Sequence, residues 1–139
     1  EIETQLSEKE IDLTGRKILL AEDNDLNWEI AEALLTERGL ELEWAENGQI
    51  CVDKFKRSPV GFYDAVLMDI RMPVMTGHEA AREIRALDRE DADIPIIAMT
   101  ADAFEEDIKR CMESGMNAHV AKPIDIREVE RQLDKFIKK

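Results

Sequence analysis

The sequence predicts an α/β domain in which helices cover a parallel β-sheet. Short apolar runs alternate strictly along the chain with segments of helical spacing, which is typical of parallel strands joined by crossover helices. The run from Ala65 to Met68 is apolar at every position, as expected for a strand that is buried on both faces. With 139 residues, of which 44% are hydrophobic, the chain can form one domain around a real core.

The apolar runs give the expected strands. In chain order these are residues 17–21, 42–45, 65–68, 96–99 and 119–121. The third strand must end before Pro73, because proline has no N–H group to donate to a strand ladder.

Five helices are expected between and after these strands. The first begins at Asn24 or Asp25, either of which can act as its N-cap, and runs to about Arg38, where Gly39 ends it. The other four are predicted from apolar residues at helical spacing, which are Ile50, Val52 and Phe55; Ala80, Ala81 and Ile84; Phe104, Ile108, Cys111 and Met112; and Ile126, Val129, Leu133, Phe136 and Ile137.

The first helix carries two apolar stripes, although a helix on a sheet needs only one. We expect the stripe of Leu26, Ile30, Ala33 and Leu34 to face the sheet, and Trp28, Ala31 and Leu35 to form the second stripe. Trp28 lies in the first turn, where little protein remains to cover it. We therefore expect Trp28 to be exposed, as a candidate for contact with a partner protein. The alternative is that Trp28 folds down over the linker.

Composition limits the partners and the location of the protein. The chain has 19 Lys and Arg residues against 32 Asp and Glu residues, which gives a formal net charge of −13. Such a surface repels nucleic acids and anionic membranes, so neither is an expected partner. No apolar run approaches the ~20 residues that a membrane span needs. Cys51 and Cys111 are expected to be buried, reduced thiols of a cytoplasmic protein.

The start of the chain predicts a linker. Residues 1–15 are polar and show no strand pattern, so we expect a linker there and the folded domain at 16–139. The chain begins with Glu1 and has no signal peptide, so we expect it to be a piece of a longer protein.

Polar side chains follow four of the predicted strands. Glu22-Asp23 follows the first, Asp69 the third, Thr100 the fourth and Lys122 the last. In open parallel sheets, ligands bind beyond the carboxyl ends of the strands, so these groups are expected to meet at one edge. Three clustered carboxylates repel one another and need a cation, and hard oxygen ligands suit Mg²⁺. A hydroxyl and an ammonium group beside them suit the oxygens of a phosphoryl group.

With these motifs the sequence resembles the response-regulator receiver domains of two-component signalling. The matching motifs are Glu22-Asp23, Asp69 followed by Met72-Pro73 and Gly77, Thr100-Ala101, and Lys122-Pro123. The resemblance covers about residues 16 to 138. The sequences of residues 20–24 and 115–124 are most similar to those of receivers fused to hybrid sensor histidine kinases. It implies a flavodoxin-like, doubly wound sheet of five parallel strands in the order 2-1-3-4-5 with five helices.

The resemblance also implies roles for the site residues. Asp69 would take a phosphoryl group from a phosphohistidine, and Lys122 and Thr100 would each bind one of its oxygens. Mg²⁺ would be held by Glu22, Asp23, Asp69 and the backbone carbonyl of Arg71, with Glu22 acting through a water molecule. The domain would thereby catalyse its own phosphorylation and dephosphorylation.

Further roles concern switching and partners. The phosphoryl group would draw Thr100 toward it, and the residue at position 119 would then turn inward; here this residue is His119 rather than the commoner Tyr or Phe. Pro123 would follow a cis peptide bond. Arg71 and Asp102 would flank the mouth of the site. The implied partner is a histidine kinase or a histidine phosphotransfer domain, which Trp28 would contact.

Three other functions compete with this reading. A flavodoxin-like redox module would need a Gly- and hydroxyl-rich phosphate loop after the first strand, where this chain has Glu22-Asp23. A phosphatase with an aspartyl nucleophile would need a second Asp at the position of Arg71. An inert pseudo-receiver that serves only as a docking module remains the alternative, which binding of a phosphoryl mimic would test.

Overall fold

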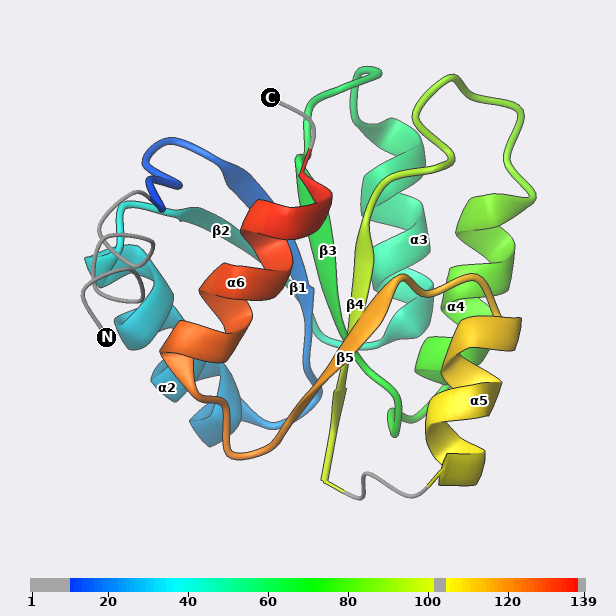
Figure 1. The fold of residues 1–139 in the computed structure, drawn as a ribbon. Helices are drawn as coiled ribbons and strands as arrows, with labels where there is room; N and C mark the ends of the chain where they lie inside the picture. The colour runs from blue at the N-terminus through cyan, green and yellow to red at the C-terminus, as the bar shows by residue number, and fades with distance from the viewer. Residues whose placement is uncertain (1–10, 102–104, 138–139) are drawn as a thin grey trace.

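The computed structural model describes residues 11–101 and 105–137 (Figure 1). These residues form one sheet of five parallel strands in the order β2-β1-β3-β4-β5. The strands are β1 (Lys17–Ala21), β2 (Glu41–Ala45), β3 (Ala65–Asp69), β4 (Ile96–Thr100) and β5 (Ala118–Ala121). The predicted fold class and strand order are confirmed.

Helices cover both faces of the sheet (Figure 1). On one face lie α2 (Asp25–Glu37) and α6 (Ile126–Phe136), and on the other lie α3 (Gly48–Arg57), α4 (Gly77–Arg85) and α5 (Glu105–Glu113). The five helices of the described residues agree in order and place with the predicted ones. This doubly wound arrangement follows from right-handed crossovers between parallel strands.

The sheet separates the core into two layers, because successive side chains of a strand point to opposite faces. In β1, Leu19 packs toward α3 and α4, whereas Ile18 and Leu20 pack toward α2 and α6. β3 is the central strand of the sheet, and all five of its residues are buried. Full burial of one such aliphatic side chain contributes about 1.5–3 kcal/mol. Both cysteines are free and buried, as predicted.

The predicted ends of α2 are also confirmed. The Asn24 side chain accepts a hydrogen bond from the backbone N–H of Asn27 at 2.9 Å, which satisfies one of the free donors at the start of the helix. Gly39 adopts φ +86° after the last turn, a conformation that favours glycine.

The prediction of which stripe of α2 faces the sheet is wrong. Ala31 and Leu35 are buried, whereas Leu26 and Ile30 are 63% and 46% exposed, and Ala33 is exposed too. Both stripes are apolar, so hydrophobicity alone could not choose between them. The position of Asn24 fixes where the helix begins, and therefore which stripe turns toward β1.

Two further expectations need correction or lie outside the described residues. Met112, predicted to face inward from α5, is 50% exposed, whereas Cys111 beside it is buried. Phe104 and Asp102 lie outside the residues that the structure describes.

The described part of the predicted linker contacts the domain. Leu13 is 2% exposed and belongs to the core layer beneath α2 and α6, and Ile11 packs against the same layer. Within the described residues, the segment before β1 therefore belongs to the packed domain from residue 11 onward.

Candidate functional site

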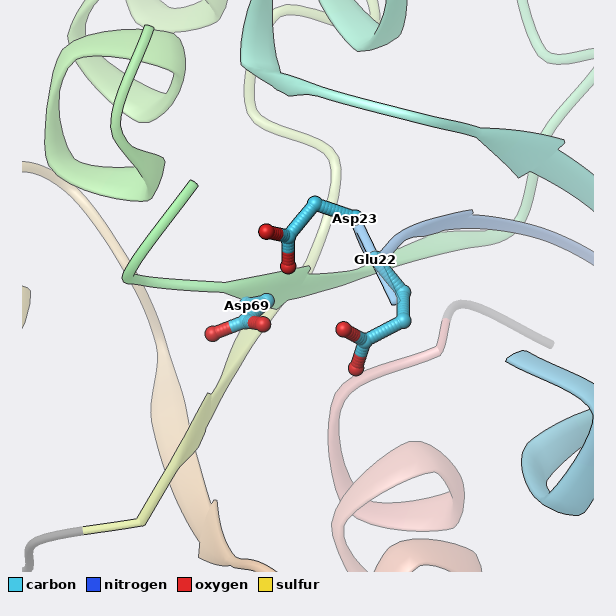
Figure 2. Close-up of side chains that lie close together, drawn as sticks. All are labelled: Glu22, Asp23 and Asp69. Carbon is cyan, nitrogen blue, oxygen red and sulfur yellow. The ribbon is translucent and has the colours of Figure 1, made fainter. Parts of the chain in front are cut away.

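The predicted polar residues meet at the carboxyl edge of the sheet. Glu22 and Asp23 follow β1, Asp69 ends β3, Thr100 ends β4 and Lys122 follows β5. Figure 2 shows the carboxylates of Glu22, Asp23 and Asp69 converging from two neighbouring strands. One oxygen from each of these three carboxylates lies within 4.8 Å of the other two.

The ammonium group of Lys122 contacts two of these carboxylates. Its Nζ atom lies 2.7 Å from Oδ2 of Asp69 and 2.9 Å from Oε1 of Glu22. The backbone of Lys122 is fixed at the same time, because its N–H donates to the carbonyl of Thr100 at 2.8 Å, and the Lys122–Pro123 peptide bond is cis. Glu22 and Asp69 are only 2% and 5% exposed, whereas Asp23 faces solvent.

Burial and charge shift two pKa values in this site. Burial raises the pKa of Glu22, and repulsion from Asp69 adds to the increase, so that together they outweigh the ion pair with Lys122. Burial would lower the pKa of Lys122, but its hydrogen bonds and charge interactions with Asp69 and Glu22 outweigh burial and raise it. Lys122 is therefore a cation at neutral pH. One ammonium group does not balance three carboxylates, so the site attracts a further cation.

The position of Asp69 depends on close backbone contact with the start of α4. A Cβ atom at Gly77 would lie 2.5 Å from the carbonyl oxygen of Asp69 and 2.8 Å from Cα of Ile70, so only glycine fits there. The N–H of Gly77 donates to the Ile70 carbonyl at 3.1 Å. The N–H of Arg71 donates to Oδ1 of Asp69 at 3.1 Å and orients the carboxylate. These contacts explain why Gly77 accompanies Asp69 in the sequence.

Trp28 is half-buried rather than exposed, so this part of the prediction is wrong. Its ring stacks on that of Trp44 from β2, with ring centroids 5.1 Å apart and an interplanar angle of 3°. Trp44 is not among the residues predicted for the site. In the sequence Trp44 is only an aromatic residue on an edge strand, 22 positions from Glu22, although its indole N–H lies within hydrogen-bond distance of the Glu22 carbonyl.

Two further predicted residues, Thr100 and His119, lie on the neighbouring strands β4 and β5. His119 is half-buried in β5, beside Ala98 of β4. Thr100 is 2% exposed.

Among the described residues, no helix is both long enough and apolar enough to cross a bilayer.

Comparison with known proteins identifies the family. A family model described as the response regulator receiver domain matches residues 18–134. The chain belongs to the response regulator receiver domain family. The acidic cluster of Glu22, Asp23 and Asp69 and the nearby Lys122 are the residues of the motifs that resemble this family.

Curated relatives of this receiver domain are much longer histidine kinases. The peroxide stress-activated histidine kinase mak1 of Schizosaccharomyces pombe is 36% identical over 118 residues, which cover 84% of this chain and 7% of the kinase. Hybrid signal transduction histidine kinase I of Dictyostelium discoideum is 38% identical over 129 residues, which cover 88% of this chain and 7% of that protein. The receiver domain thus spans a small part of these relatives.

Solved receiver domains share the fold. That of a sensor histidine kinase from Pseudomonas aeruginosa PAO1, crystallised with a magnesium ion in its active-site cleft, is 40% identical with a TM-score of 0.79; the match covers 88% of this chain and 98% of that one. The receiver domain of Ssk1 from Saccharomyces cerevisiae, solved with the histidine phosphotransfer protein Ypd1, is 27% identical with a TM-score of 0.78, covering 87% and 88% of the two chains.

Proposed function

We propose that this receiver domain accepts a phosphoryl group from a phosphohistidine on the carboxylate of Asp69. The observation that carries the proposal is the contact of Lys122 Nζ with Asp69 Oδ2 at 2.7 Å, beside two further carboxylates on β1. A buried carboxylate at the end of a central strand, in contact with an ammonium group, suits a role in phosphoryl transfer better than a purely structural role.

The transfer takes place between the Asp69 carboxylate and the phosphohistidine of the donor. One oxygen of Asp69 attacks phosphorus, and the new O–P bond forms as the N–P bond of the phosphohistidine breaks. The bonding electron pair leaves with the imidazole nitrogen, which takes up a proton from water. Lys122 then binds an oxygen of the acyl phosphate as a point charge, and the Thr100 hydroxyl donates a hydrogen bond to another.

The donor set of the site fits Mg²⁺. Glu22, Asp23 and Asp69 supply hard carboxylate oxygens within 4.8 Å of one another, with Asp23 open to solvent so that the ion can keep water ligands. The backbone carbonyl of Arg71 is a proposed fourth ligand, and Glu22 is proposed to act through water because Lys122 already contacts it. When bound there, Mg²⁺ offsets the negative charge of the carboxylates and of the transferring group.

A conformational response is proposed to follow phosphorylation. Thr100 would shift toward the phosphoryl group, and His119 on the neighbouring strand would turn into the space that Thr100 leaves. Chemical-shift changes of His119 upon binding of beryllofluoride, a phosphoryl mimic, would test this response. They should disappear in the Asp69→Asn variant.

A histidine kinase or histidine phosphotransfer domain is the proposed partner. Leu26 and Ile30 on α2 are exposed apolar residues one turn apart. Ile30 also lines a cavity of about 60 Å³ together with Lys122, Pro123 and Ile124. An apolar patch at the rim of the site suits contact with the donor protein. We place the docking surface on Leu26 and Ile30, with Trp28 beneath it through its stack on Trp44.

Intact-mass measurement tests the proposed function. Incubation with a small phosphoryl donor and Mg²⁺ should add one phosphoryl group to the wild type and to Asp88→Asn, an exposed carboxylate control. The Asp69→Asn variant should gain none. A wild type that neither gains mass nor binds beryllofluoride would instead favour the inert docking module. We further propose that this receiver domain, predicted from the sequence at residues 16–139 and extended by the core contacts of Ile11 and Leu13, is part of a longer hybrid kinase.

A further inference from the structure

Trp44 reaches from the edge strand β2 over the end of β1. Its indole N–H donates a hydrogen bond of 2.7 Å to the carbonyl oxygen of Glu22. The backbone N–H of Glu22 donates to the carbonyl of Ala45 at 3.0 Å. Both main-chain polar groups of Glu22 are therefore held by β2. Since the Glu22 carbonyl belongs to the planar peptide bond that leads into Asp23, its orientation sets where the Asp23 side chain begins.

The Trp44 ring is held by α2, and the Trp44 backbone is held by α3. Trp28 of α2 stacks parallel to it, with ring centroids 5.1 Å apart. Lys54 of α3 donates to the Trp44 carbonyl at 2.8 Å and pairs with Glu43 at 3.1 Å. Flat aromatic side chains lose little entropy when they are fixed in this way, because they have only two side-chain torsions. The indole N–H is thus presented at a defined point above β1.

The acidic pair needs such support. The β1–β2 ladder ends at the register pair Ala21 and Ala45, so the Glu22 carbonyl lies beyond the regular strand pairing. The carboxylates of Glu22, Asp23 and Asp69 lie within 4.8 Å of one another, and like charges at this distance drive the loop toward wider arrangements. A hydrogen bond to the peptide between the two acidic residues opposes that movement.

We propose that Trp44 is a positioning residue for the cation site: its indole N–H fixes the Glu22–Asp23 peptide so that the Asp23 carboxylate stays directed at Asp69. The inference rests on the proposed function of these carboxylates as a Mg²⁺ site. Groups that orient metal ligands without touching the metal commonly change metal affinity by ~10–100-fold when they are removed. Trp44 acts on the backbone rather than on a ligand side chain, so the lower end of that range is expected.

Conservative aromatic variants separate the N–H group from the ring. Trp44→Phe keeps an aromatic ring for the stack but removes the donor, whereas Trp28→Phe keeps the stack and the Trp44 donor. Mg²⁺ affinity is measured for each by NMR titration of backbone amides with MgCl₂, and stability by urea unfolding. We expect Trp44→Phe to weaken Mg²⁺ binding by about tenfold, and Trp28→Phe to keep the wild-type affinity. Equal loss in both variants, or no loss in either, would overturn the inference.

A measurement on the wild type covers the case in which Trp44→Phe does not fold. In ¹⁵N-labelled protein the two indole N–H resonances are separately visible. The Trp44 indole proton should exchange slowly with solvent and shift during the Mg²⁺ titration, and the Trp28 indole proton should shift far less. Rapid exchange of the Trp44 proton, or its insensitivity to Mg²⁺ while Asp23 and Asp69 respond, would overturn the positioning role and leave the proposed function intact. A wild type without any Mg²⁺ response would overturn both.

Discussion

Lys122 and Asp69 illustrate how single residues define this site. Their contact of 2.7 Å joins the end of β5 to the end of β3 across the intervening strand β4. The two residues are 53 positions apart in sequence, so only the parallel sheet brings them together. A buried ion pair of this kind contributes little net stability, because desolvation offsets much of the attraction. Its geometry suits the proposed binding of a phosphoryl group.

Gly77 gives a prediction at the residue scale. In Gly77→Ala the new methyl group would overlap the Asp69 carbonyl oxygen, so β3 and the start of α4 must separate. We expect the free energy of unfolding to fall by about 1–3 kcal/mol, the usual range for overpacking. Phosphorylation by a small donor should slow as well, because Asp69 moves. Urea unfolding and intact-mass time courses measure the two effects.

Gly15→Ala is the matched control for Gly77→Ala. A Cβ atom at Gly15 would meet no other atom within 4 Å, and only its φ of +81° disfavours alanine. This variant should be destabilised by backbone strain of about 1 kcal/mol and keep its phosphorylation rate. A Gly77→Ala protein that is as stable and as fast as the wild type would show that the close contact is unimportant.

The site residues could be predicted from the sequence to different extents. Glu22, Asp23, Asp69, Thr100 and Lys122 each follow an apolar run, so strand prediction alone placed them at one edge. Trp44 could not be found in this way, because its role depends on a hydrogen bond from a side chain on one strand to the backbone at the end of another. The exposure of Trp28 was misjudged for the same reason, since Trp44 covers it.

At the scale of elements, α2 shows what a helical pattern leaves undetermined. Its two apolar stripes differ in phase rather than in composition, and the choice between them depends on where the helix begins relative to β1. The outcome leaves Leu26 and Ile30 exposed at the rim of the site. Element order and most helix ends, in contrast, follow from local signals such as Asn24 and Gly39.

The exposed face of α2 gives a second prediction. Leu26→Glu should slow phosphoryl transfer from a cognate histidine phosphotransfer protein by at least tenfold, because a charge would enter the apolar contact. Phosphorylation by a small donor should proceed at the wild-type rate. Met112→Glu is the matched control, since Met112 is a similarly exposed apolar residue on α5, over the other face of the sheet. If both variants slow transfer equally, α2 is not the docking surface.

Arg85 gives a third prediction, about the joints between elements. Its guanidinium group donates to the carbonyls of Gly115, Ala92 and Ile94 and to the side chain of Asn117, at 2.7–2.9 Å. It therefore ties the end of α4 to the segments that lead into β4 and β5. We expect Arg85→Ala to lower the free energy of unfolding by about 3 kcal/mol, because hydrogen bonds to a charged group are lost and carbonyls are left unpaired.

The control for Arg85→Ala is Arg82→Ala, on the exposed side of the same helix. It should change the free energy of unfolding by less than about 0.5 kcal/mol, as surface substitutions usually do. Urea unfolding of the two variants is a direct comparison. If Arg85→Ala and Arg82→Ala have the same free energy of unfolding, the hydrogen bonds of Arg85 contribute no more to stability than those of an exposed arginine.

The whole molecule combines a neutral, apolar core with an acidic surface of net charge −13 and a carboxylate cluster at one edge of the sheet. Concentrated negative charge attracts divalent cations and makes stability depend on them. If Mg²⁺ binds only the folded state, a concentration ten times its dissociation constant stabilises the protein by about 1.4 kcal/mol.

This coupling should depend on pH through Glu22. Burial raises the pKa of Glu22 in the folded protein above its pKa in the unfolded chain, so the folded protein without metal binds a proton more tightly. The free energy of unfolding therefore falls as pH rises from the unfolded-state pKa to the folded-state pKa of Glu22. Protons also compete with Mg²⁺ in that interval. The Mg²⁺-induced rise in Tm should therefore be larger at pH 7.5 than at pH 5.

Glu22→Gln tests this assignment, since glutamine has a similar shape but does not titrate. In this variant the Mg²⁺-induced rise in Tm should depend less on pH between 5 and 7.5 than in the wild type. Differential scanning fluorimetry with and without MgCl₂ at each pH measures it. The same pH dependence in both proteins would assign the coupling to groups other than Glu22.

The central claim is that Asp69 carries the phosphoryl group, and chemical trapping tests it most directly. Borohydride reduces an aspartyl phosphate to homoserine, which peptide mass spectrometry locates in the sequence. After phosphorylation by a histidine donor in Mg²⁺, we predict homoserine at position 69 in the wild type and none in a sample treated with donor but without Mg²⁺. Homoserine at another aspartate, or trapping that persists in Asp69→Asn, would contradict the account.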